Sequence, residues 1–115
     1  MSNILITGAA GFIGFHLANF HQQKGHKVFI FDNYFKNKSE DNEFKNLIKK
    51  KNVFFYKLDL NKKIKLEDNK LKKFDTIYHL SAINGTSLFY KIPYQVFTSN
   101  IKMTLNLLDW LKDKK

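Results

Sequence analysis

Three glycines near the start of the chain, Gly8, Gly11 and Gly14, have a spacing that could hold a diphosphate. They follow an apolar run at 4–6 and precede an amphipathic segment, which predicts a strand, a tight turn and the start of a helix. Backbone N–H groups point outward at a helix start, where the helix dipole also favours negative charge. We expect Gly8 to allow the turn, Gly11 to admit the phosphates and Gly14 to let the helix pack close to the strand. A glycine-rich turn without a ligand is the alternative interpretation.

An acidic residue stands at the distance that such a turn requires. Asp32 ends the second apolar run of the chain, at 27–31. In a dinucleotide-binding fold, a carboxylate here accepts hydrogen bonds from the adenosine ribose hydroxyls, and it would repel a 2′-phosphate. The position therefore predicts NAD rather than NADP. The alternative is a polar residue that merely ends a strand.

The elements that would position these groups alternate along the chain. Strands are predicted at 3–7, 27–32, 53–58 and 75–80, and helices at 11–23, 43–50 and from Pro93 onward. We expect loops at 33–42 and 83–92, and a loop with a short helix at 61–73. Right-handed crossovers then give an α/β fold, a Rossmann-type doubly wound parallel sheet with strand order 3-2-1-4.

Apolar residues at helical spacing predict which helix faces are buried. On the first helix these are Ile13, Leu17 and Phe20. On the last helix the predicted buried face is formed by Phe97, Ile101, Leu105, Leu108 and Leu111.

Composition narrows the function classes. The 115 residues carry a formal charge of +10, and all 20 basic residues are lysine. Without arginine, bidentate guanine recognition is unavailable, so we interpret the lysines as a solvated surface and consider a nucleic-acid partner unlikely. The chain has no cysteine, which excludes disulfides and thiolate metal sites. It shows no apolar run that could span a membrane and no secretory signal, so we expect a cytoplasmic protein with no membrane partner.

The sequence ILITGAAGFIG at 4–14 resembles the start of an extended short-chain dehydrogenase/reductase. More narrowly, it is similar to the NAD-dependent epimerase/dehydratase family that works on nucleotide sugars. The likeness continues along nearly the whole chain. It implies NAD as cofactor and an adenine contact from Asp59 and Leu60, which follow the third predicted strand. The alternative for Asp59 is a plain acid at the end of a strand.

Further cofactor contacts are implied by the same resemblance. The run HLSA at 79–82 matches the family's HLAA after its fourth strand, where small residues let the backbone approach the cofactor. We interpret His79 itself as a packed strand residue rather than an acid or base, because no carboxylate partner is evident. The remaining residues expected at the cofactor are Ala10, Phe12, Ile13, Asn33, Leu80, Ser81, Ala82 and Asn100. For Asn100 the alternative is an ordinary helix asparagine.

The catalytic groups of the family have no counterpart in this chain. The resemblance implies a Ser or Thr after a fifth strand and a Tyr-x-x-x-Lys pair on the next helix. Tyr34 and Lys38 share that spacing but would lie at the adenosine end, so we reject them as catalytic. We therefore expect residues 1–115 to be an incomplete NAD(P)-binding domain without catalytic residues or a metal site. The alternative is a noncatalytic nucleotide-binding module that complements a partner.

A truncated sheet has a consequence for association. The strand predicted at 75–80 would form a bare edge, because no fifth strand follows it in this sequence. Unpaired strand edges pair readily with other chains. We therefore expect a homo-oligomer or a partner at this edge.

Overall fold

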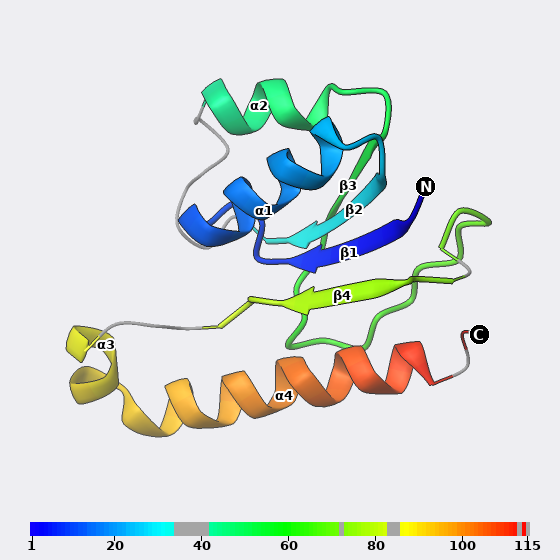
Figure 1. Ribbon diagram of the computed structural model, residues 1–115. Helices are drawn as coiled ribbons and strands as arrows, with labels where there is room; N and C mark the ends of the chain where they lie inside the picture. The colour runs from blue at the N-terminus through cyan, green and yellow to red at the C-terminus, as the bar shows by residue number, and fades with distance from the viewer. Residues whose placement is uncertain (34–41, 72, 83–85, 113, 115) are drawn as a thin grey trace.

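The computed structural model describes residues 1–33, 42–71, 73–82, 86–112 and 114. Four parallel strands form one sheet in the order β3-β2-β1-β4, which confirms the predicted order (Figure 1). The expected loop at 33–42 falls mostly outside the described residues. The strands are β1 (Asn3–Thr7), β2 (Lys27–Asp32), β3 (Val53–Lys57) and β4 (Thr76–His79), and the helices are α1 (Phe12–Gln23), α2 (Asn42–Ile48), α3 (Thr86–Lys91) and α4 (Pro93–Leu111).

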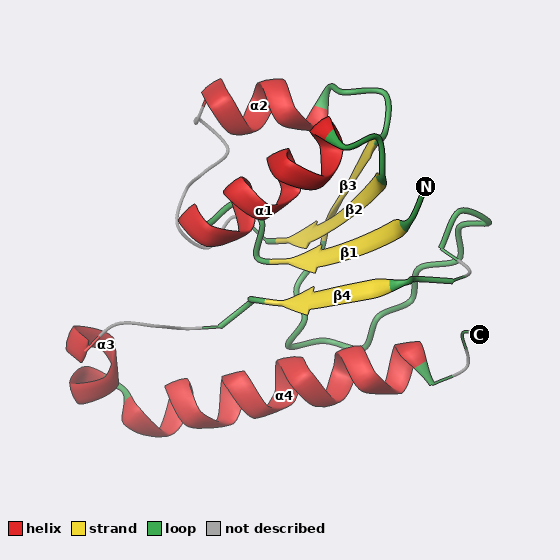
Figure 2. Ribbon diagram, viewed as in Figure 1, coloured by secondary structure: helices red, strands yellow, loops and turns green. Residues whose placement is uncertain are grey.

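Helices cover both faces of the sheet (Figure 2). α1 and α2 pack on one face, against strand residues such as Ile4 and Ile6. α4 packs on the opposite face, where Leu5 meets Met103 and Leu107. Because neighbouring residues of β1 point into different cores, the strand must be apolar at every position rather than at alternate ones. No helix in the described part of the chain is both long and apolar enough to cross a membrane.

The predicted buried face of α1 is wrong in two of its three residues. Ile13 is 65 % exposed and Phe20 is 52 % exposed, whereas Gly14 and Ala18 are buried. The helix is pressed so closely against the turn before it that a Cβ on Gly14 would lie 2.5 Å from the Gly8 carbonyl oxygen. Only small residues fit at this contact, so the bulky side chains are turned outward.

The predicted buried face of α4 is wrong as well. Val96, Met103 and Leu107 are the buried residues of the helix. Four of the five residues that we expected inside are between 44 % and 66 % exposed. We call these four the outer stripe of α4; they are Phe97, Ile101, Leu105 and Leu108.

Hydrogen bonds to the segment after β3 explain why α4 buries a different face from the predicted one. The Ser99 hydroxyl donates to Oδ1 of Asn61 at 2.8 Å, and the Asn106 amide donates to the Leu60 carbonyl at 2.6 Å. The Trp110 indole N–H lies 3.4 Å from the Leu66 carbonyl. These polar residues share one side of the helix with Met103, so satisfying them turns the outer stripe toward solvent.

Two connecting segments also differ from expectation. The described residues of 61–73 form turns and irregular chain with no helix, and the side chains of Ile64 and Leu71 in this segment are buried. Asp68 organises this segment, since it accepts the Tyr56 hydroxyl at 2.7 Å and the Lys70 N–H at 3.0 Å. The loop expected at 83–92 instead contains the short helix α3.

The contact at Gly14 predicts a stability difference between two glycines of the same turn. Gly14→Ala should lower the free energy of unfolding by about 1–3 kcal/mol, because the added methyl group overlaps the backbone of Gly8 and Ala9. Gly11→Ala is the matched control, since the nearest atom to its Cβ would be 3.3 Å away. Urea unfolding measures both values. An equal loss for the two variants would contradict the packing role of Gly14.

Candidate functional site

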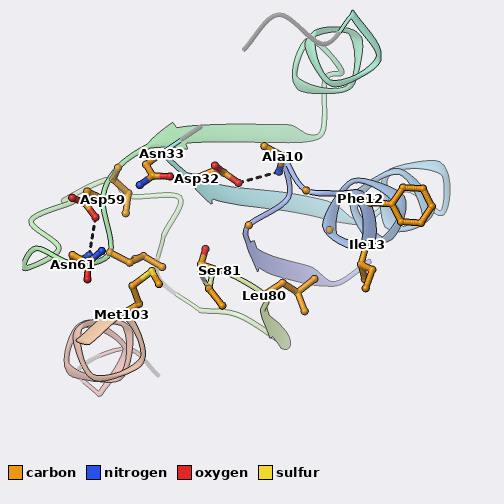
Figure 3. A pocket seen from close by; sticks show the side chains of 16 residues that line it. Ala10, Phe12, Ile13, Asp32, Asn33, Asp59, Asn61, Leu80, Ser81 and Met103 are labelled. Carbon is orange, nitrogen blue, oxygen red and sulfur yellow. Dashed lines mark hydrogen bonds between the residues drawn. The ribbon is translucent and has the colours of Figure 1, made fainter. Parts of the chain in front are cut away.

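A cavity of about 550 Å³ opens at the carboxyl ends of the strands (Figure 3). This is the place where ligands bind in open α/β sheets. Thirteen of the fourteen expected cofactor residues line it. Asn100 does not, and its proposed contact stays a prediction. The thirteen are Gly8, Ala10, Gly11, Phe12, Ile13, Gly14, Asp32, Asn33, Asp59, Leu60, Leu80, Ser81 and Ala82.

The glycine turn forms one wall of the cavity. Gly8 has a φ of +79°, and a Cβ on it would lie 2.9 Å from the backbone of Leu80 and Ser81. A side chain is therefore excluded by both conformation and space. At Gly11 the added atom would meet only the Gly8 carbonyl oxygen within 4 Å, at 3.3 Å, and Gly11 lines the cavity. At Gly8 and Gly11 the turn thus presents backbone without a side chain to the cavity.

The start of α1 has no side-chain cap. Its N-cap residue is Gly11, which makes no side-chain hydrogen bond to the first turn. Helices usually satisfy their first N–H groups with a Ser, Thr, Asp or Asn at this position. Residues 11–14 at this helix end line the cavity, where the positive end of the helix dipole lies. An anion of the size of a phosphate suits this end of the helix.

Asp32 connects the end of β2 to the same turn. The Ala10 N–H donates to Oδ2 of Asp32 at 3.0 Å, so the carboxylate is held beside the glycines (Figure 3). The side chain is half-buried and lines the cavity. An oriented carboxylate beside an anion-binding helix start is suited to binding a hydroxyl-bearing sugar next to a phosphate.

The segment after β3 forms the opposite wall. Asp59 accepts the Asn61 N–H at 2.9 Å, and Leu60 is almost fully buried. Three lining residues were missed by sequence reasoning: Leu58, Asn61 and Met103. The first two flank the predicted Asp59–Leu60 pair, so the position of that pair could have indicated them. Met103 comes from α4, and no sequence signal marks it.

The turn after β4 forms a further wall of the cavity. The Leu80 N–H donates to the Thr7 carbonyl, and the Ser81 N–H donates to Oγ1 of Thr7, both at 3.1 Å. β1 therefore fixes the backbone that follows β4. Figure 3 shows Leu80 and Ser81 extending from this turn beneath the glycine wall.

Together, the parallel sheet, the uncapped helix start and the carboxylate at the end of β2 define a dinucleotide-binding α/β fold. The model of the NAD dependent epimerase/dehydratase family matches residues 4–115. The chain belongs to this family, which confirms the resemblance read from its sequence.

Individual relatives agree with the family assignment. The chain is 34 % identical, over 96 % of its length, to a UDP-N-acetyl-alpha-D-glucosaminuronate decarboxylase of Bacillus cytotoxicus, of which it covers 33 %. Among solved structures, it is similar to a UDP-glucose-4-epimerase from Stenotrophomonas maltophila with bound NAD and formylated UDP-arabinopyranose. That match has a TM-score of 0.77 at 28 % identity and covers 98 % of this chain and 34 % of the other.

A second solved structure is the UDP-Glc/GlcNAc 4-epimerase of Campylobacter jejuni. Its TM-score is 0.76 at 25 % identity, and the match covers 96 % of this chain and 33 % of that one. The chain therefore spans about a third of the length of the relatives that it matches.

Proposed function

We propose that this chain binds NAD as the cofactor-binding part of a nucleotide-sugar epimerase- or dehydratase-like protein, with residues 1–115 as an incomplete NAD(P)-binding domain. The observation that carries the proposal is the uncapped start of α1, which faces the cavity through Gly11. The strand order supports it, because the connection reverses direction between β1 and β4 and ligands bind at such a switch point.

The lining residues suggest how the dinucleotide would lie. The pyrophosphate would contact the turn from Gly8 to Gly14, and the adenosine ribose would bind Asp32. Asp59, Leu60 and Asn33 would surround the adenine. The nicotinamide ribose would then reach the backbone after β4, at Leu80, Ser81 and Ala82.

Bound NAD would accept a hydride from a sugar carbon and return it in a later step. In this proposal the chain supplies binding and orientation, and we assign it no catalytic residue. The Tyr34–Lys38 pair, rejected above as catalytic, lies outside the described residues. Nucleotide sugars are proposed as substrates because the relatives named above bind or act on UDP-linked sugars. A cytoplasmic location stays a prediction.

A specific observation favours association with a partner, as the alternative function requires. Among the described strands, β4 pairs with β1 alone, and its Ile77 is 38 % exposed. The outer stripe of α4 is uncovered on one face of the sheet, and Ile13 and Phe20 of α1 are uncovered on the other. We propose that a further strand pairs with β4 and that apolar segments cover these helices.

Substituting Gly11 should separate binding from folding. Gly11→Val should weaken NAD binding by at least about tenfold, because the side chain would fill the space proposed for the phosphates. The fold should persist, since Gly11 has the extended conformation (φ −78°, ψ 172°) that valine favours. Calorimetric titration measures affinity and thermal unfolding measures stability. Gln23→Val, at the exposed far end of α1, is the control, and unchanged affinity in Gly11→Val would remove the phosphate role.

Asp32 should set the choice between the two dinucleotides. Asp32→Asn keeps an acceptor for the Ala10 N–H but removes the charge that would repel a 2′-phosphate. The ratio of NADP to NAD dissociation constants should fall by about tenfold. Asp59→Asn, across the cavity, should leave the ratio unchanged. Tighter binding of NADP than NAD by the unaltered chain would overturn the assignment.

Association should depend on the outer stripe of α4. Light scattering at high protein concentration should show the chain as an oligomer or aggregate, and Leu105→Lys should shift it toward monomer. The matched control is Asn46→Lys, which adds the same charge at an exposed position of α2. A monomeric unaltered chain, or equal effects of both variants, would argue against this surface.

A further inference from the structure

His79 occupies a polar junction between three elements. It lies opposite Thr7 in the pairing of β4 with β1. Its Nδ1 is 2.7 Å from Oγ1 of Thr7, and its Nε2 is 3.1 Å from Oγ1 of Thr104 on α4. Both ring nitrogens therefore have hydroxyl partners, so the imidazole connects β4 to β1 and to α4.

The hydroxyl of Thr7 determines which nitrogen of the His79 ring is protonated. Thr7 is fully buried, and its Oγ1 already accepts the N–H of Ser81. Among the contacts of the described residues, the only atom able to accept the Thr7 hydroxyl proton is Nδ1 of His79. A buried hydroxyl proton without an acceptor is costly, so Nδ1 must be unprotonated.

The protonation of Nε2 follows from the hydroxyl of Thr104 by the same argument. The Thr104 hydroxyl lies 3.1 Å from the Asn100 carbonyl, to which it donates, so its oxygen is left to accept. Nε2 of His79 therefore carries the proton. Burial lowers the pKa of His79, which agrees with a neutral ring at pH 7.

The junction acts on the cavity through one backbone group. Once its proton points at His79, the Thr7 oxygen presents a lone pair to the N–H of Ser81, which lines the cavity. The backbone here has little freedom, because Gly8 approaches Leu80 and Ser81 so closely that a Cβ would lie 2.9 Å away. A displacement of the Ser81 backbone would therefore move one side of the cavity.

We propose that neutral His79 is a positioning residue for NAD: through the Thr7 hydroxyl it holds the backbone of Ser81 at the edge of the cofactor cavity. This role rests on the proposed NAD site, but the arrangement of protons does not. The competing role is that of a strand residue that only fills space. A substitution that removes the hydrogen bond but keeps the shape of the side chain distinguishes the two roles. It should affect Ser81 only if His79 is a positioning residue.

The proton arrangement is tested on the unaltered chain. The ¹⁵N spectrum of the imidazole should show His79 as neutral, with Nε2 protonated and Nδ1 bare, at pH 7. A proton on Nδ1, in either the other tautomer or the cation, would overturn the proposal. This measurement needs neither a variant nor a cofactor, so it decides the point even if NAD does not bind.

Variants test the link to the cavity. His79→Leu removes the acceptor, and Thr7→Val removes the hydroxyl with little change of shape. Each should speed amide exchange at Ser81 and weaken NAD binding by about three- to tenfold. The double variant should be no weaker than either single one, because both changes break the same link.

His79→Asn is the conservative comparison, since its Oδ1 can take the place of Nδ1 as acceptor. It should retain most of the NAD affinity and of the protection at Ser81. Equal losses in His79→Asn and His79→Leu would reduce His79 to a packing residue. If no form of the chain binds NAD, the proposed function fails, while exchange at Ser81 still tests the positioning role.

Discussion

The close contact between the glycine turn and its neighbours is the constraint on which the rest of the structure depends. On one side α1 sits so near the turn that Gly14 leaves no room for a methyl group. On the other side Gly8 reaches the backbone that follows β4. Both contacts are made by backbone, so the cavity wall carries no side chain at Gly8 or Gly14. The exposed helix donors, the position of Asp32 and the closure by Leu80 and Ser81 all follow from this geometry.

The local parts of this arrangement could be predicted from sequence. β1 and β2 have the predicted bounds, and the other two strands agree within one residue at either end. The strand order was correct because crossover handedness leaves few choices for a parallel sheet. Of the thirteen lining residues, the glycines and Asp32 were found from their places after β1 and β2, and the others chiefly from the family resemblance. In each case the residues that indicate a feature lie within a few positions of that feature in the sequence.

The parts that failed depend on contacts distant in sequence. On α4, apolar residues occur on two sides, so periodicity alone could not decide which side is buried. That choice is made by the bonds of Ser99, Asn106 and Trp110 to the segment after β3. On α1, the stripe containing Ile13 and Phe20 was the more apolar one, yet the small residues Gly14 and Ala18 made the closer contact. Close packing, rather than apolar surface, determined the orientation of that helix.

The outer stripe of α4 gives the chain a particular response to ionic strength. The molecule carries a formal charge of +10, so copies repel one another while their apolar faces remain uncovered. At about 0.15 M salt the repulsion is screened beyond about 8 Å, whereas apolar contact is not weakened. Colloidal stability is therefore highest in dilute buffer. The charges of the lysines keep copies of the chain apart, and this effect weakens as the salt concentration rises.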